Sequence, residues 1–178
     1  NKYREKLAEE LPVGRQIQAG ADSIALQRKE IFREKCTMLL PEVMSDMEER
    51  KAAVKYRNQN RPQVIKSDVK GDASFTFSLI SADEGEETPL KRLKKIQDDM
   101  KKIWKQNVFY DMGEVYADML PVAWMDFKSF CLNGSLYNLL FLFDFEERTV
   151  LGNFHCVFSE YDIWKPVVLK LLTTIQID

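Results

Sequence analysis

The chain has 178 residues, of which 45% are hydrophobic, 30% charged and 11% aromatic, with a formal net charge of −2. This length and composition exclude a chain that is disordered throughout and leave no room for two large domains. The near-neutral charge excludes the strongly basic footprint of a generic nucleic-acid-binding protein.

Three cysteines, an odd number without paired spacing, do not form the disulfide framework of a small secreted domain. We therefore expect an intracellular protein, located in the cytoplasm or the nucleus. The longest apolar run, Leu136 to Phe143, contains Asn138 and ends at Asp144. A helix that crosses a membrane needs about 20 apolar residues, so this run is too short and we expect no membrane partner.

Residues 1–58 are expected to form a helical arm, in part a coiled coil. From Ala21 to Tyr56, apolar residues recur at the spacing of one helical stripe. A second set of apolar residues repeats every seven residues beside this stripe. Polar residues at the alternate heptad positions argue against a full leucine zipper. Pro41 should kink the helix. Such a narrow seam cannot bury itself alone, so we expect residues 17–56 to bind a protein partner or a second copy. The candidate partner-binding residues are Ile17, Ile24, Ile31, Phe32, Met38 and Leu39.

A linker and a head domain are expected to follow the arm. Residues 59–71 read as the linker because Pro62 and Gly71 break regular structure. The head is expected to span residues 72–178. It begins with ASFTFSLIS, whose alternation of apolar and polar side chains predicts a half-buried strand.

The next element is an amphipathic helix, expected over residues 88–107. Thr88 followed by Pro89 is typical of a helix start. One face is apolar and the other is basic, interrupted by Asp98 and Asp99. This basic face is the candidate surface for an anionic partner, with Lys91, Lys94, Lys95, Lys101, Lys102 and Lys105 as its members. A solvated helix face without a partner is the alternative interpretation.

An antiparallel meander is expected after this helix. Residues 109–123 are ambiguous, and a short helix that ends before Pro121 is one interpretation. WMDFKSFCL and SLYNLLFLFDF flank Asn133-Gly134, a dipeptide typical of a two-residue hairpin turn. A turn at 146–149 and the segment TVLGNFHCVF complete three strands. The middle strand is apolar on both faces, so it should be central and covered on both sides.

The last element expected is a helix over residues 160–176, because Ser159 and Asp162 have the spacing of a capping motif. The expected fold class is therefore α+β: an N-terminal helical, coiled-coil-like arm, then a small antiparallel sheet flanked by helices. In layout alone, this order resembles the arm-plus-head proteins of kinetochores and related scaffolds, whose heads are RWD-like.

No catalytic, cofactor or metal residues are expected. His155 and Cys156 are adjacent, but successive residues of a strand point to opposite faces and could not share an ion. The single histidine would have to serve any Ser-His or Cys-His pair, and neither a G-x-S-x-G elbow nor a glycine-rich phosphate loop occurs. Paired carboxylates, such as Asp98 and Asp99, fall in predicted turns or on solvated helix faces.

Three functional hypotheses follow from the sequence. The first is a non-catalytic protein–protein interaction or assembly module, such as a scaffold or adaptor subunit of a larger complex. The alternative is a nucleic-acid-associated protein that uses the basic face of helix 88–107. The third is an enzyme of an unfamiliar type with a pocket around His155.

Overall fold

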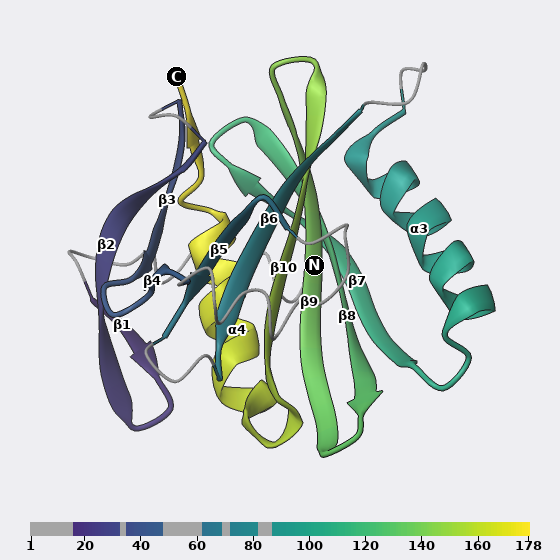
Figure 1. Cartoon of the computed structure of the whole chain (residues 1–178). Coiled ribbons are helices and arrows are strands. Elements are labelled where there is room, and N and C mark those ends of the chain that lie inside the picture. The colour runs from purple at the N-terminus through teal and green to yellow at the C-terminus, as the bar shows by residue number, and fades with distance from the viewer. Residues whose placement is uncertain (1–15, 33–34, 48–61, 69–71, 82–86) are drawn as a thin grey trace.

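The computed structural model describes residues 16–32, 35–47, 62–68, 72–81 and 87–178. In this part of the chain, strands form two antiparallel sheets that pack with two α-helices (Figure 1). The smaller sheet has the order β1-β2-β3-β11, with bounds β1 Gln16–Ala19, β2 Asp22–Phe32, β3 Cys36–Pro41 and β11 Gln176–Ile177. The larger sheet has the order β4-β5-β6-β10-β9-β8-β7, with bounds β4 Ser45–Asp46, β5 Val64–Ser67, β6 Ser74–Ser81, β7 Val108–Ala117, β8 Leu120–Cys131, β9 Gly134–Phe145 and β10 Arg148–Val157. The helical elements are α3 Pro89–Ile103, the short 3₁₀ helix η1 Phe158–Glu160 and α4 Tyr161–Leu172.

The central meander of the larger sheet confirms the expected strands, with one difference at the first turn. The loop between β8 and β9 is Leu132-Asn133, because Gly134 already pairs as the first residue of β9. The positive φ angles of a type I′ turn occur instead at the next hairpin, where Glu146 has φ 47° and Glu147 has φ 59°. Both are non-glycine residues in a conformation that usually favours Asn or Gly.

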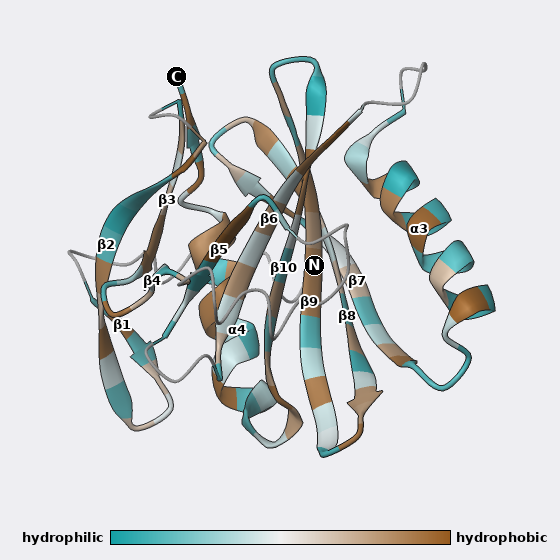
Figure 2. Ribbon diagram, viewed as in Figure 1, coloured by the Kyte–Doolittle hydropathy of each residue, from teal (hydrophilic) through white to brown (hydrophobic). Residues whose placement is uncertain are grey.

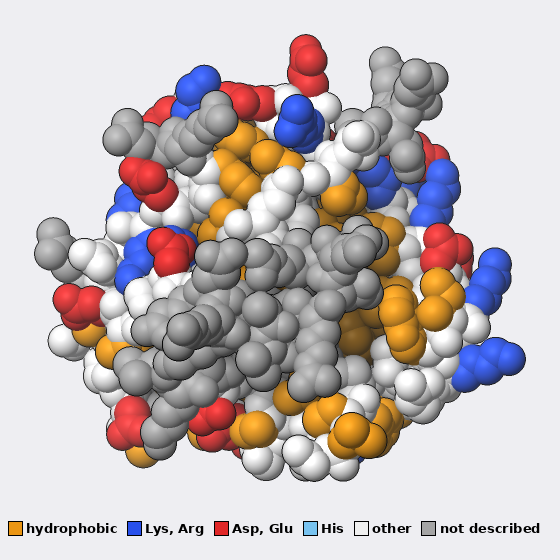
Figure 3. Space-filling view, viewed as in Figure 1, with side chains coloured by type: hydrophobic (Ala, Val, Ile, Leu, Met, Phe, Trp, Pro, Cys, Tyr) orange, Lys and Arg blue, Asp and Glu red, His pale blue; other side chains and the backbone are white. Residues whose placement is uncertain are grey.

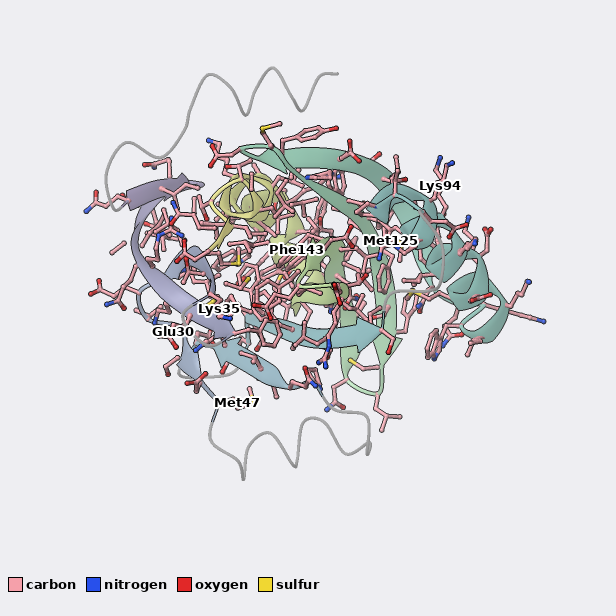
Figure 4. The ribbon with its side chains drawn as sticks, turned by 90° about the horizontal axis from the view of Figure 1, so that it is seen from above. Glu30, Lys35, Met47, Lys94, Met125 and Phe143 are labelled. Atoms are coloured by element: carbon pink, nitrogen blue, oxygen red, sulfur yellow. The ribbon has the colours of Figure 1, made fainter. Side chains whose placement is uncertain are left out.

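The main core lies between the two sheets and surrounds α4. Alternate side chains of β9 point into it: Tyr137, Leu139, Phe141, Phe143 and Phe145. The opposite face of β9 contributes Leu140 and Leu142 to a smaller core beneath α3. Figure 4 shows Phe143 in the interior, Met125 on the side of α3, and Lys94 pointing outward from that helix. The expectation of a central strand that is covered on both faces is therefore confirmed, and each buried aromatic ring contributes about 1.5–3 kcal/mol.

The two helices begin as local chemistry dictates. The Thr88 side chain accepts a hydrogen bond from the amide of Lys91 at 3.3 Å, and Pro89 occupies the first turn, so this predicted start is confirmed. The start of α4 differs from the capping motif expected there, because the Asp162 carboxylate accepts a hydrogen bond from the adjacent amide of Ile163. Figure 2 shows that α3 exposes a hydrophilic face, whereas α4 is largely hydrophobic between the sheets.

The N-terminal helical arm and its coiled coil are wrong, and so are the α+β class and the RWD-like layout. Residues 16–32 and 35–46 form strands β1 to β4, and the structure is mostly β. The first three of these strands build the smaller sheet, while β4 pairs with β5 in the larger one. The rest of the expected arm lies outside the described residues, apart from Met47.

Two further segments that were not expected to be strands also form strands. Within the expected linker, Val64–Ser67 is β5, which lies between β4 and β6. The ambiguous segment 109–123 belongs to β7 and β8, so the short helix considered there is wrong. These strands turn at Asp118, whose φ of 53° permits a tight hairpin. Finally, α4 ends at Leu172, and β11 closes the edge of the smaller sheet against β3.

Candidate functional site

A buried charge cluster lies where β7, β8, β9 and α4 meet. Its centre is Asp126, a carboxylate of β8 that is only 1% exposed. The Tyr137 hydroxyl donates to Asp126 Oδ2 at 2.7 Å, and the amide of Asp111 donates to Oδ1 at 2.8 Å. That amide is available because the register of β7 against β8 shifts between Phe109 and Met112, which leaves the intervening residues out of the regular ladder.

Lys165 of α4 supplies the positive charge of this cluster. Its Nζ atom lies 2.8 Å from Asp126 Oδ2 and 2.5 Å from Asp111 Oδ2, and stands 5.4 Å from the centre of the Trp124 ring. Burial is the largest single influence on the pKa of Lys165 and lowers it, but the hydrogen bonds and charges of the two carboxylates together outweigh it and raise the pKa. The side chain therefore stays an ammonium ion and fastens α4 to the sheet.

Neither Lys165 nor Tyr137 is prepared for acid–base chemistry. Burial, followed by the negative charge of Asp126, raises the pKa of Tyr137, so the phenol keeps its proton and acts as a hydrogen-bond donor. A general base near neutral pH would need the opposite change in the pKa of a lysine or tyrosine. We name Asp111, Asp126, Tyr137 and Lys165 the charge cluster, and its geometry is that of a structural ion pair.

An aromatic surface continues from the charge cluster to solvent. We define it by five residues of β7, β8, η1 and α4: Tyr110, Lys128, Phe130, Phe158 and Tyr161. Tyr110 and Phe130 are each 49% exposed, and Tyr161 is 43% exposed. In Figure 3, hydrophobic side chains gather at the lower end of the molecule, over the turn between β8 and β9.

Ring contacts fix this surface against the fold. Phe158 stacks on Tyr161 at 5.1 Å and lies 6.3 Å from Tyr110, while Tyr161 lies 5.8 Å from the buried ring of Tyr137. The Lys128 amine stands 4.2 Å from the centre of the Phe158 ring and 5.3 Å from that of Phe130, cation–π contacts that fix its position. The exposed rings are therefore ordered before any partner arrives.

The alternation of β8 explains why the cluster and the surface lie on one line. Trp124, Asp126, Lys128 and Phe130 point to the same face, and they pass from buried at the first two to exposed at Phe130. The sequence showed this alternation in WMDFKSF. Two charged residues on the inner face of a predicted strand were the signal that could have indicated a buried ion pair.

The residues expected to bind a partner through the arm contact the chain's own core. Ile17, Ile31 and Met38 are buried in the main core, and Ile24, Phe32 and Leu39 are partly buried against it. Phe32 also stacks on Phe145 with ring centres 6.1 Å apart. The structure therefore brings this set together inside the fold, around the smaller sheet.

The lysines of α3 and of the turn that follows it are all exposed: Lys91, Lys94, Lys95, Lys101, Lys102 and Lys105. Lys95 donates to both carboxylate oxygens of Glu87 at 2.6 and 2.8 Å, and this bond lowers the pKa of Glu87. Asp98 and Asp99 are exposed on the same helix. Nucleic-acid binding by these lysines stays a prediction.

His155 and Cys156 occupy consecutive positions of β10. Cys156 belongs to the main core, and burial raises the pKa of its thiol to about 12, so it is not a thiolate at neutral pH. His155 is buried between Ser74 and Asn138 in the strand register. Among the described residues, no group of three or more His, Cys, Asp or Glu side chains could bind a metal ion.

Comparisons with known proteins identify a fold without a family. No protein family and no curated protein matches the chain. Among solved structures, the cyanobacterial PsbP protein (CyanoP) of Synechocystis sp. PCC 6803 is similar with a TM-score of 0.62 and 10% identity, over 94% of this chain and 99% of that one. A protein from Bacteroides thetaiotaomicron VPI-5482 has a TM-score of 0.52 and 9% identity, over 81% of this chain and 45% of that one.

A third solved structure, PA94 from Pseudomonas aeruginosa, is described as a protein of unknown function and putative regulator. Its TM-score is 0.50 with 8% identity, over 84% of this chain and 94% of that one. Among the described residues, no helix has both the length and the apolar character needed to cross a membrane. At these low sequence identities, structural similarity shows a shared fold, and a shared fold alone assigns no activity. We conclude that this chain has the fold of the cyanobacterial PsbP protein.

Proposed function

We propose that this protein is a non-catalytic binding module that docks a protein partner through the aromatic surface. The observation that carries the proposal is the combination of exposure and contact in three half-exposed rings. Tyr161 packs near the buried ring of Tyr137, Tyr110 near the partly buried ring of Phe158, and Phe130 against the amine of Lys128. Tyrosine and other aromatic residues are enriched in the centres of protein interfaces because they bury a large area with few rotatable bonds. Rigid rings lose little side-chain entropy on binding.

A protein partner fits this surface better than a small substrate does. The aromatic surface combines apolar rings with the hydroxyls of Tyr110 and Tyr161 and the amine of Lys128, which is the mixture found at interface centres. The neighbouring charge cluster supports the same reading, because Lys165 and Tyr137 keep their protons and are already bonded to Asp126. The cluster therefore stabilises the site and offers no reactive group.

The proposal keeps the binding role expected from the sequence and places it on another surface. Ile17, Ile31 and Met38 would have to leave the core before they could contact a partner, whereas the aromatic rings are accessible as they stand. An intracellular location is part of the proposal and rests on three free thiols, of which Cys131 is exposed. In the part of the chain that the structure describes, Lys95 contacts Glu87 and Lys101 contacts Phe109, and neither contact favours the nucleic-acid alternative over this proposal.

Site-specific photo-crosslinking tests the proposal. A benzophenone amino acid replaces Phe130 in cells that produce the protein, and Tyr116, an exposed aromatic residue at the far end of β7, receives the same replacement as a control. We expect one dominant protein adduct from position 130 and none of that adduct from position 116. Equal adducts from both positions would show general surface contact and contradict the proposal.

Binding measurements with the identified partner then provide the energetic test. Replacing an interface anchor by alanine costs about 2 kcal/mol or more, so Phe130→Ala and Tyr161→Ala should each weaken binding about 30-fold. Tyr116→Ala should change the affinity by less than about threefold. Unchanged affinity in both anchor variants would exclude the aromatic surface as the interface. Sedimentation of the wild-type chain distinguishes a second copy of this chain from a different partner.

A further inference from the structure

A second exposed feature lies at the end of α3, where the chain turns into β7. We name it the lysine–tryptophan tip and define it by Lys101, Lys102, Ile103, Trp104, Lys105 and Val108. Its apolar members are unusually accessible for their size: Ile103 is 66% exposed, Trp104 46% and Val108 43%. In Figure 2, hydrophobic colour marks the last turn of α3 and the start of β7, with hydrophilic colour in the turn between them.

The tip protrudes because α3 extends beyond the sheet that covers its apolar stripe. Leu93 is fully buried in the smaller core and Met100 is partly buried against it, whereas Ile103 continues the same stripe into solvent. Two backbone hydrogen bonds hold the turn that follows. The amide of Trp104 donates to the carbonyl of Met100 at 2.8 Å, and the amide of Asn107 donates to the carbonyl of Trp104 at 3.1 Å. The apolar groups are thus displayed on an ordered, convex corner.

Between Met100 and Tyr110 all charged side chains are basic, whereas the acidic Asp98 and Asp99 are exposed one turn earlier on α3. Lys101, Lys102 and Lys105 are exposed, and no acidic residue occurs between Met100 and Tyr110. The Lys101 amine stands 5.5 Å from the centre of the Phe109 ring, which ties the side chain to the start of β7. At the right edge of Figure 3, over α3, basic side chains project beside hydrophobic ones and an acidic one.

We infer that the lysine–tryptophan tip binds the surface of a lipid bilayer with anionic headgroups. Tryptophan and long aliphatic side chains partition into the interface between headgroups and acyl chains, and adjacent lysines are attracted to anionic lipids. This contact needs no membrane-spanning helix. A nucleic acid would engage the lysines but would leave Ile103 and Val108 without an apolar environment. A bilayer satisfies both kinds of side chain on one convex corner.

Vesicle co-sedimentation at low salt tests the inference with the whole chain. We expect binding to phosphatidylcholine vesicles that contain about 30% phosphatidylglycerol, and little binding to phosphatidylcholine alone. The double variant Lys102→Ala/Lys105→Ala should lower the partition coefficient about 25-fold, since each lysine near an anionic surface accounts for about fivefold. The double variant Lys91→Ala/Lys94→Ala removes the same charge from the other end of α3 and should retain most of the binding.

Apolar insertion has its own readout. The variant Ile103→Ser should lower binding to anionic vesicles, and tryptophan emission should shift to shorter wavelength on binding in the wild type but not in Trp104→Phe, which retains Trp124 and Trp164. Equal binding to neutral and anionic vesicles, or an equal loss in the two lysine pairs, would overturn the inference. So would binding to single-stranded RNA that exceeds binding to anionic vesicles and depends on the same tip residues.

Discussion

Removing the amine of Lys165 should destabilise the fold more than any surface charge change, because it leaves a buried carboxylate without its cation. Asp126 is 1% exposed, and its remaining partners would be the Tyr137 hydroxyl and one backbone amide. Breaking a buried ion pair on one side costs about 3–5 kcal/mol. We expect Lys165→Met to lower the free energy of unfolding by that amount in urea denaturation at pH 7.

A double-mutant cycle separates the interaction from the cost of each replacement. Asp126→Asn alone removes the buried negative charge beside Lys165 and should cost about 3 kcal/mol, although the ion pair between Lys165 and the partly exposed Asp111 remains. The double variant Asp126→Asn/Lys165→Met leaves neither charge of the pair buried. Its loss should therefore be about 2 kcal/mol or more below the sum of the two single losses.

The exposed ion pair of Lys35 and Glu146, with atoms 3.2 Å apart, is the matched control. Its side chains are more than half exposed, so the corresponding cycle should give a coupling of less than about 1 kcal/mol. A coupling for Asp126 and Lys165 as small as that of this surface pair would refute the reasoning, because it would show that burial does not strengthen the interaction.

Three further predictions concern alkaline pH, packing and capping. Burial raises the pKa of Cys36 and Cys156 from 9.0 to about 12, so both thiols keep their protons in the fold while the unfolded chain ionises above pH 9. The free energy of unfolding should therefore fall by about 1.4 kcal/mol per thiol between pH 8 and pH 10. In urea unfolding, the variant Cys36→Ala/Cys156→Ala should show a fall that is about 3 kcal/mol smaller than the fall of the wild type. Gly152→Ala would place a Cβ atom 2.2 Å from the Phe141 ring, and this overpacking should lower the free energy of unfolding by about 1–3 kcal/mol or more. Gly113→Ala, whose Cβ atom would have its nearest contact at 3.1 Å, should cost less in the same assay. Equal losses in the two variants would contradict the packing argument. Thr88→Ala removes the side chain that caps α3 and should lower stability by about 1 kcal/mol, and no loss in thermal unfolding would show that the cap is dispensable.

The mistaken arm shows how a hairpin can imitate a heptad. In a hairpin with a two-residue turn, cross-strand partners are separated in the sequence by an odd number of residues: three, five, seven and so on. Ile17 and Ile24 are such partners in β1 and β2. Their spacing of seven thus arises from strand pairing. A shift of register near Glu30 then changes which side of β2 is buried, so that Leu26 and Ile31 both reach the core. The alternation of buried and exposed side chains that is typical of a strand was therefore hidden by the turn between β1 and β2 and by the register shift in β2.

Segments with one dominant signal were predicted more successfully. The strand at 74–81 was recognised from strict alternation, and α3 from Thr88-Pro89 followed by an amphipathic stripe. The segment at 109–123 failed because β7 contains Gly113 and an irregular register, and because Pro121 near the start of β8 resembles a helix end. Tertiary pairing decided these residues, and a single sequence does not show it.

The candidate site could be predicted only in part for the same reason. Alternation in WMDFKSF places Asp126 and Lys128 on one face, and this much is visible in the sequence. The cation that neutralises Asp126 comes from α4, and the second carboxylate comes from an irregular position in β7. Neither has a local spacing relation to Asp126. Convergence of three elements created both the buried charge cluster and the rigid aromatic surface above it.

The two proposed binding surfaces adjoin, and this has a thermodynamic consequence. Val108 of the lysine–tryptophan tip is the strand partner of Lys128 in the aromatic surface, and Tyr110 lies two residues farther along β7. A bilayer seated on the tip would therefore crowd a protein that docks on the aromatic rings. If both proposals hold, saturating the partner should weaken vesicle binding, and vesicles should weaken partner binding by the same factor, because linkage is reciprocal. Independent binding would require that one of the two contacts lie elsewhere on the chain.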